Sequence, residues 1–135
     1  VPILFGGNSD KTIERVLSWG AGWTGGGAPA AQSAPYATKV RNAWSAAGRD
    51  GEPRIASLAY FSLGEDAEEA SRKYLLDYYG FLGDYAPMIA NGALRSVSQV
   101  TDAVKAFEDA GFTELYFDPT VAKLDQIDRL ADAVL

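Results

Sequence analysis

The hydrophobic pattern of this chain alternates between two periods. Short apolar runs typical of strands are each followed by a segment with apolar residues three and four positions apart, which predicts a helix. Residues 2–5 have no polar face, and this favours a strand that is covered on both sides. The pattern predicts strands at 2–5, 23–24, 54–63 and 113–117, and helices at 10–18, 33–47, 65–79, 96–110 and 120–134.

Four strand–helix units in series predict one α/β domain over residues 1–135, with parallel strands joined by right-handed crossovers. An open doubly wound sheet and half of a closed barrel both satisfy this order. Residues 81–95 are aromatic, contain glycine and lack a period, so we interpret them as an insertion or lid. The carboxyl ends of the four strands face one side, where α/β proteins bind ligands.

The first strand ends in Gly6 and Gly7, followed by Asn8 and Ser9, either of which could cap the next helix. Flexible backbone beside a helix N-terminus forms an anion-binding geometry. An ordinary turn that needs glycine and a cap is the alternative interpretation of the same residues. Asp10 would repel a phosphate here, and its neighbour Lys11 would attract one.

Composition narrows the functional classes. The chain has 12 Lys and Arg against 18 Asp and Glu, a net charge of −6, so nucleic acid is not an expected partner. No apolar run approaches the roughly 20 residues that span a bilayer, and no signal peptide is recognisable. With no cysteine, the cytoplasm is the predicted compartment.

Histidine is absent too, which removes the commonest general base and metal ligand. We therefore expect no metal site, and the catalytic residues stay unknown. Asp118 follows a strand but is interpreted as a turn and capping residue, and Trp23 as core more than as a border of a cofactor. A group of aromatic residues could line a pocket or could pack helices beneath a lid: Tyr74, Tyr78, Tyr79, Phe81 and Tyr85.

Several segments together resemble a known family. PILFGGNSDKTIERVLSWGAGW resembles the strand–GG–helix–GDGW segment of the bacterial-luciferase-like flavin-dependent monooxygenases, a superfamily that includes F420-dependent reductases. Residues 54–64 with the acidic helix start resemble its RxxxxxFxxxG-D-xxEA segment, and residues 78–80 its DYYG. Residues 111–119 are similar to its GVDELILDP strand.

The resemblance implies a TIM (β/α)8 barrel, which needs about 250 residues. By the order of its motifs, this chain resembles the second half, a C-terminal half-barrel fragment. It implies FMN, or alternatively F420, in the intact protein, with a small organic substrate, and Gly6, Gly7, Asn8 and Ser9 near the cofactor phosphate. In the intact enzyme reduced FMN would react with O₂, or the deazaflavin would pass a hydride. Since the reactive side chains lie mainly on the other half, this chain alone is expected to be inactive and could hold no cofactor.

Two further expectations follow. A half barrel has two unpaired edges and an uncovered inner face, which predicts a homo-oligomer. The sequence opens with Val1 and not Met, as expected of a processed or excised piece. The alternative function is a stand-alone, non-catalytic α/β domain that binds a phosphorylated ligand or a protein.

Overall fold

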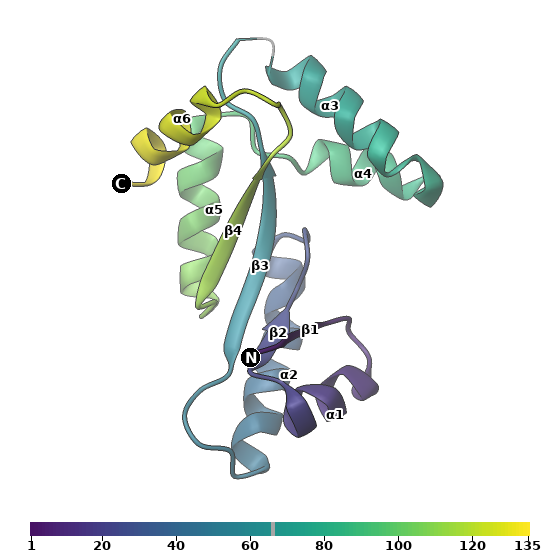
Figure 1. Ribbon diagram of the computed structural model, residues 1–135, viewed down its shortest axis with the longest axis vertical. Coiled ribbons are helices and arrows are strands. Elements are labelled where there is room, and N and C mark those ends of the chain that lie inside the picture. The colour runs from purple at the N-terminus through teal and green to yellow at the C-terminus, as the bar shows by residue number, and fades with distance from the viewer. Residues whose placement is uncertain (66) are drawn as a thin grey trace. The chain divides into compact units, whose positions relative to one another are not determined.

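The computed structural model describes residues 1–65 and 67–135, in which short strands alternate with helices (Figure 1). The four strands join in the order β1-β2-β3-β4, and β1–β2 and β2–β3 pair in parallel. The prediction of an α/β fold with four βα units is confirmed. In chain order the elements are β1 (Leu4–Gly6), α1 (Asp10–Trp19), β2 (Gly22–Thr24), α2 (Ala30–Ala46), β3 (Arg54–Phe61), α3 (Ala67–Tyr78), η1 (Gly80–Leu82, a 3-10 helix), α4 (Tyr85–Asn91), α5 (Val97–Asp109), β4 (Glu114–Pro119) and α6 (Asp125–Val134).

The strand register sets which side chains enter the core. Phe5, Trp23 and Ile55 are aligned across β1, β2 and β3, and all three belong to one hydrophobic cluster. One position earlier, Gly22 of β2 is paired with Arg54 of β3. A Cβ added to Gly22 would lie 1.8 Å from the backbone oxygen of Arg54. Only glycine therefore permits this close approach of β2 to β3.

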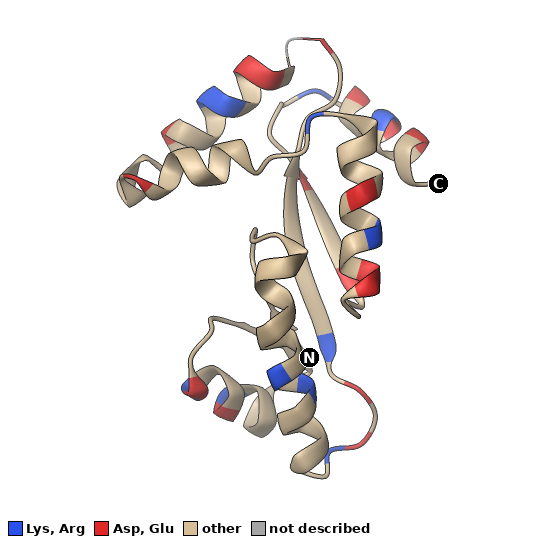
Figure 2. Ribbon diagram, turned by 180° about the vertical axis from the view of Figure 1, so that it is seen from behind, with Lys and Arg blue, Asp and Glu red and all other residues tan. Residues whose placement is uncertain are grey.

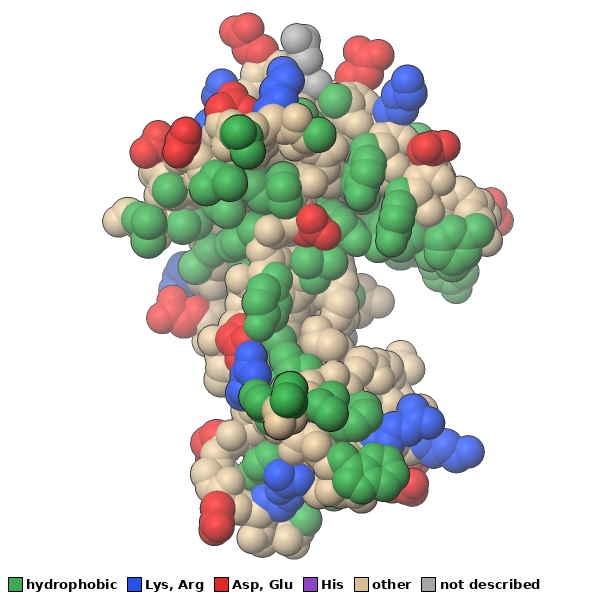
Figure 3. Space-filling view, in the orientation of Figure 1, with side chains coloured by type: hydrophobic (Ala, Val, Ile, Leu, Met, Phe, Trp, Pro, Cys, Tyr) green, Lys and Arg blue, Asp and Glu red, His purple; other side chains and the backbone are tan. Residues whose placement is uncertain are grey.

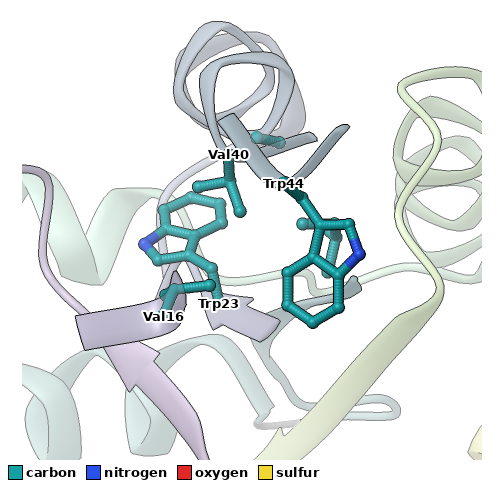
Figure 4. Close-up of a cluster of buried hydrophobic side chains, with 6 residues drawn as sticks. Val16, Trp23, Val40 and Trp44 are labelled. Atoms are coloured by element: carbon teal, nitrogen blue, oxygen red, sulfur yellow. The ribbon is translucent and has the colours of Figure 1, made fainter. Parts of the chain in front are cut away.

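The chain divides into two compact units. The first contains Val1–Leu58 and Ala106–Tyr116, and its buried core draws on α1, β2, α2 and β3. Val40 of α2 points toward the Trp23 ring of β2 (Figure 4). The fully or almost fully buried members of this core are Val16, Trp23, Ala37, Val40, Trp44 and Ile55.

The second unit contains Ala59–Lys105 and Phe117–Leu135, and it has two smaller clusters. Phe61, Leu63 and Val100 form one of them, and the other lies between α3 and α4 around Leu75. The buried amide of Gln126 both accepts a hydrogen bond from the Leu63 N–H (2.8 Å) and donates one to the Leu63 carbonyl (2.9 Å). This amide attaches α6 to the end of β3.

Helix boundaries differ from the expectation in three places. The helix α2 begins at Ala30, preceded by Pro29, so that Pro35 lies inside the helix and not in its first turn. Residues 81–95, which have no periodic pattern, contain most of η1 and all of α4. The last helix begins at Asp125, five residues later than expected.

The predicted buried faces of two helices are partly wrong. The helical spacing predicts Ala67, Ala70, Tyr74, Leu75 and Tyr78 on the buried face of α3, and Leu124, Ile127, Leu130, Ala131 and Val134 on that of α6. On α3 the buried residues are Ala67, Ser71 and Leu75, four positions apart, whereas Tyr74 and Tyr78 are exposed. Small residues at 67 and 71 let the helix backbone approach its neighbours, and the two tyrosines are left on the solvent side. Near α6, Leu124 and Ile127 are likewise exposed and not buried.

Charged side chains are concentrated on the helices and loops (Figure 2). Among the strands that the structure describes, only Arg54, Glu114 and Asp118 carry charge. No helix formed by the described residues is long and apolar enough to cross a membrane.

Candidate functional site

A pocket of about 410 Å³ opens in the first unit beside the turn that follows β1. Its wall also includes the loop after β2 and one side of the first turns of α2. All of these segments belong to the first unit of the chain. The lining residues are Asn8, Trp23, Gly25, Ala28, Gln32, Ser33, Pro35, Tyr36 and Lys39.

The turn from Gly6 to Ser9 is held from both sides. The indole N–H of Trp23 donates to the Gly7 carbonyl at 2.7 Å, and the Tyr36 hydroxyl donates to the Ser9 carbonyl at 2.8 Å. Gly7 has φ +102°, and a Cβ there would lie 2.9 Å from Thr12 Oγ1. The sequence requirement for glycine at this position is therefore both conformational and steric.

Two helix N-termini lie at this pocket without a side-chain cap. Ser9 occupies the N-cap position of α1, but its side chain makes no capping hydrogen bond. The N-cap residue of α2 is Pro29, which also makes none. The first N–H groups of a helix have no partner within the helix, and its N-terminus carries about half a positive charge. The two N-termini add positive potential at the pocket, and Asp10 in the first turn of α1 opposes it.

One ion pair lies at the pocket. Lys39 Nζ contacts Asp10 Oδ1 at 2.6 Å, and the two side chains are 55% and 84% exposed. The hydrogen bond and charge of Lys39 lower the pKa of Asp10, and Asp10 raises the pKa of Lys39 in the same way. Partial burial raises the pKa of Tyr36, so its hydroxyl stays a hydrogen-bond donor at neutral pH.

The four predicted phosphate residues occupy one turn. Asn8 lines the pocket, while Gly6, Gly7 and Ser9 form the turn beside it. Trp23 belongs to the core, as interpreted from the sequence, since it is 3% exposed, and it also lines the pocket.

The sequence interpretation missed the contribution of α2. Gln32, Ser33, Tyr36 and Lys39 all line the pocket and recur three or four positions apart, so they share one helix face. This polar stripe was the available signal. The predicted helix at 33–47 leaves out Gln32, because α2 begins three residues earlier, at Ala30.

The other candidates lie in the second unit. Asp118 is exposed and lies within β4, and the N-cap of α6 is Leu124, so the interpretation of Asp118 as a capping residue is wrong. The Tyr60 and Tyr79 hydroxyls share a 2.5 Å hydrogen bond, and burial followed by this bond raises the pKa of Tyr60. Tyr74, Tyr78, Phe81 and Tyr85 are exposed. Within the described residues no cluster of three or more acidic side chains could hold a metal ion.

Comparison with known proteins decides the family. The sequence model of the family described as "Luciferase-like monooxygenase" matches residues 1–95. This chain belongs to that family. The family resemblance seen in the sequence is thereby confirmed. No curated protein sequence gives a significant match.

Solved structures match the fold at low sequence identity. An F420-dependent secondary alcohol dehydrogenase in complex with an F420-acetone adduct matches all of this chain and 49% of its own, with a TM-score of 0.71 and 15% identity. The coenzyme F420-dependent tetrahydromethanopterin reductase from Methanopyrus kandleri matches 99% of this chain and 49% of its own (TM-score 0.63, 15% identity). EDTA monooxygenase from Chelativorans sp. BNC1 matches 98% of this chain and 45% of its own (TM-score 0.66, 14% identity).

The chain thus spans about half the length of the solved structures that it matches. Those structures are TIM-barrel enzymes, so the predicted likeness to half of such a barrel is confirmed. At these identities the likeness concerns the fold alone.

Proposed function

We propose that this chain is the cofactor-binding half of a luciferase-like, flavin-dependent oxidoreductase. Its pocket would receive the phosphate of a flavin-type cofactor, FMN or F420. The observation that supports this most directly is the meeting of two uncapped helix N-termini at one pocket in a member of this family. When bound, the cofactor supplies the redox chemistry, and the chain supplies binding and orientation.

The residues present fit a phosphate group. Gly7 keeps the turn open to close approach, and Asn8 and Ser9 offer backbone N–H groups with an amide and a hydroxyl. The bonds from Trp23 and Tyr36 hold the turn before any ligand arrives, so little ordering is needed on binding.

A binding measurement tests this assignment. FMN and riboflavin differ only in the phosphate, so we expect the full chain to bind FMN more tightly than riboflavin. Asn8→Asp places a negative charge in the pocket and is expected to weaken FMN binding about tenfold while leaving riboflavin unchanged. Asn42→Asp makes the same change on an exposed position of α2 outside the pocket lining, and is the matched control.

Equal affinity for FMN and riboflavin would overturn the phosphate assignment. Equal effects of Asn8→Asp and Asn42→Asp would instead place the phosphate elsewhere on the chain.

We further infer that the chain supplies the second four strands of the barrel and is inactive alone. The neighbours are about twice as long, and the chain contains no histidine. Oxidation of reduced FMN by O₂ in the presence of the chain should therefore be no faster than with free FMN. A clear acceleration would show that one half is sufficient.

A stand-alone phosphate-binding domain is the second candidate, because every lining residue of the pocket comes from the first unit. This candidate predicts that a simple sugar phosphate competes with FMN at comparable affinity. The oxidoreductase proposal predicts that FMN binds more tightly, since its ring adds contacts.

A further inference from the structure

The hairpin of α3 and α4 (residues 67–91) exposes a run of aromatic rings on the second unit. Tyr74 stacks on Tyr78 with ring centroids 5.9 Å apart, and Tyr78 contacts Tyr79 at 4.9 Å. The Tyr79 ring lies 6.3 Å from that of Phe81, so the rings form one continuous row. Apolar side chains gather over α3 and α4 (Figure 3). The large exposed apolar residues of the hairpin are Tyr74, Tyr78, Phe81, Leu82, Tyr85 and Met88.

The area of this surface is of the size that a stable interface requires. The exposed fraction of its aromatic residues runs from 44% for Tyr74 to 79% for Phe81. An aromatic side chain has about 200 Å² of surface, so the four exposed rings together present about 500 Å². Stable interfaces bury about 800 Å² per partner, and about two thirds of the interface core is apolar. With Leu82 and Met88, the hairpin supplies the apolar core of such an interface.

The hairpin is shaped to pack against a second hairpin. The helix α4 returns beside α3 (Figure 1), and Leu75 and Ala90 belong to the cluster buried between them. Tyr74 and Tyr78 lie on a different side of α3 from its buried residues. A second hairpin packed on the tyrosine side would complete a four-helix arrangement, which is how paired helices bury an apolar face.

The charges beside the tyrosines complement themselves. Lys73 and Asp77 are exposed and lie one helical turn apart, next to Tyr74 and Tyr78. When two copies of α3 pack antiparallel about a two-fold axis, Lys73 of each copy lies opposite Asp77 of the other. The surface is therefore complementary to a second copy of itself in charge as well as in apolar character.

The other charges of the hairpin disfavour a membrane as the occupant. Anionic lipid surfaces attract segments rich in Lys and Arg. One of the two bases of the hairpin, Arg72, donates to the side chain of Asn91. Acids outnumber bases over residues 67–91, with Glu68, Glu69, Asp77 and Asp84 against Arg72 and Lys73.

We propose that the exposed aromatic surface of the α3–α4 hairpin binds a second copy of this chain, in a two-fold contact that pairs the α3 helices antiparallel. The contact is separate from the phosphate pocket, because every lining residue of that pocket belongs to the first unit. Failure of either proposal therefore leaves the other intact.

Light scattering of the full chain over a dilution series tests the contact. The wild-type chain should reach twice its 14.4 kDa mass as the concentration rises. Asp77→Lys and Lys73→Asp each place like charges opposite one another at both ends of the two-fold contact. Each variant should weaken the dimer about tenfold.

An equimolar mixture of these two variants is the decisive sample. In each mixed dimer opposite charges again face one another at both positions, so the mixture should recover the wild-type dissociation constant. A disturbance within a single helix would not be repaired by mixing. Asp102→Lys makes the same charge change at an exposed position of α5 in the second unit, and should change the dissociation constant less than twofold.

A cross-link gives a second, independent readout, because the chain has no cysteine of its own. Antiparallel pairing of Lys73 with Asp77 places Tyr74 close to the two-fold axis. Tyr74→Cys should therefore form a disulfide-linked dimer with oxidised glutathione. Trp19→Cys is the matched control in the first unit: it should stay monomeric although Trp19 is 72% exposed and Tyr74 only 44%.

Three results would overturn the inference. The first is a wild-type chain that stays monomeric over the whole dilution series, including one that instead binds phosphatidylserine vesicles. The second is a dimer that neither charge reversal weakens. The third is a mixture of the two variants that associates no more tightly than either variant alone.

Discussion

The two units of the chain bury their aromatic residues differently. In the first unit Trp23 and Trp44 are 3% and 6% exposed within one continuous core, although Trp19 and Tyr116 lie on the surface. In the second unit, apolar side chains gather on the surface of α3 and α4 (Figure 3). We call this the α3–α4 apolar face; its exposed members are Tyr74, Tyr78, Phe81, Leu82, Tyr85 and Met88.

The difference indicates separate roles. A binding site needs walls that keep their positions, and the pocket is built on the unit with the single core. A contiguous exposed apolar surface marks an interaction site in soluble proteins. The second unit is therefore the better candidate for contacts with another protein surface.

The largest expected change in stability follows from the substitution of Trp44. Its ring is buried, stacks on the Arg49 guanidinium at 3.9 Å and donates to the Gly51 carbonyl at 3.0 Å. Trp44→Ala should lower the free energy of unfolding by about 3–5 kcal/mol. Leu63→Ala, in a smaller cluster of the second unit, should cost about 2 kcal/mol. Urea unfolding followed by circular dichroism measures both losses, and a loss below about 3 kcal/mol for Trp44→Ala would contradict the prediction.

The next largest change in stability is expected in the turn from Gly6 to Ser9, which borders the pocket. Gly7→Ala places a Cβ 2.9 Å from Thr12 Oγ1 at φ +102° and should cost about 2 kcal/mol of stability. Gly26→Ala is the control, since Gly26 also has positive φ but no atom lies within 4 Å of the added Cβ. It should cost about 1 kcal/mol. Thermal unfolding of both variants measures the difference, and a costlier Gly26→Ala would argue against the steric role of Thr12.

A smaller contribution to stability, from the ion pair of Arg54 and Glu114, depends on pH. Arg54 donates to both carboxylate oxygens of Glu114, at 2.5 and 2.6 Å, and the Tyr116 hydroxyl also donates to Glu114. The bonds from Arg54 and then Tyr116 lower the pKa of Glu114 from 4.5 to about 2. A lowered folded-state pKa stabilises the protein above pH 4.5, and this contribution is lost as the pH falls toward 2.

Glu114→Gln should therefore cost about 1 kcal/mol at pH 7, because the pair is partly exposed, and less as the pH is lowered below 4.5. Unfolding free energies at pH 7, 5 and 3 test this. Glu52→Gln changes an exposed acid of the same unit and should show no such trend. A constant cost at all three values would refute the ionic origin.

The smallest stability effect is expected on the α3–α4 apolar face. Replacing Tyr78, Phe81 and Tyr85 together by serine should change stability by less than about 0.5 kcal/mol per residue, because all three are exposed. If this face drives the predicted homo-oligomer, the variant should shift to lower mass in light scattering. Trp19→Ser, on the surface of the first unit, should leave the mass unchanged. The face has no role in assembly if the triple variant keeps the wild-type mass.

Local patterns predicted most elements but not every buried face. The spacing on α3 permits two overlapping stripes, one through Tyr74 and Tyr78 and one through Ala67, Ser71 and Leu75. The period alone does not choose between them, because the choice depends on how closely a neighbouring element can approach. The small side chains of Ala67 and Ser71 allow that approach, so the second stripe is buried.

The local sequence pattern also failed to predict where α2 begins. Pro35 suggested a first turn, since a missing N–H has little cost there. The helix nevertheless begins five residues earlier, and Ser33 is buried with its hydroxyl near the Ala28 carbonyl at 3.5 Å. The added turn buries Ala30 and Ser33 within the first unit, which offsets the hydrogen bond that Pro35 cannot form.

The sequence by itself determined the four strand–helix units, the family and the turn from Gly6 to Ser9, because these depend on local spacing and backbone freedom. Only the tertiary structure decided what faces that turn. Tyr36 reaches Ser9 across 27 positions and Lys39 reaches Asp10 across 29. Such contacts depend on how the β2–α2 unit packs beside β1–α1, and no local pattern records that packing. The charge of the proposed phosphate site is therefore a property of the fold.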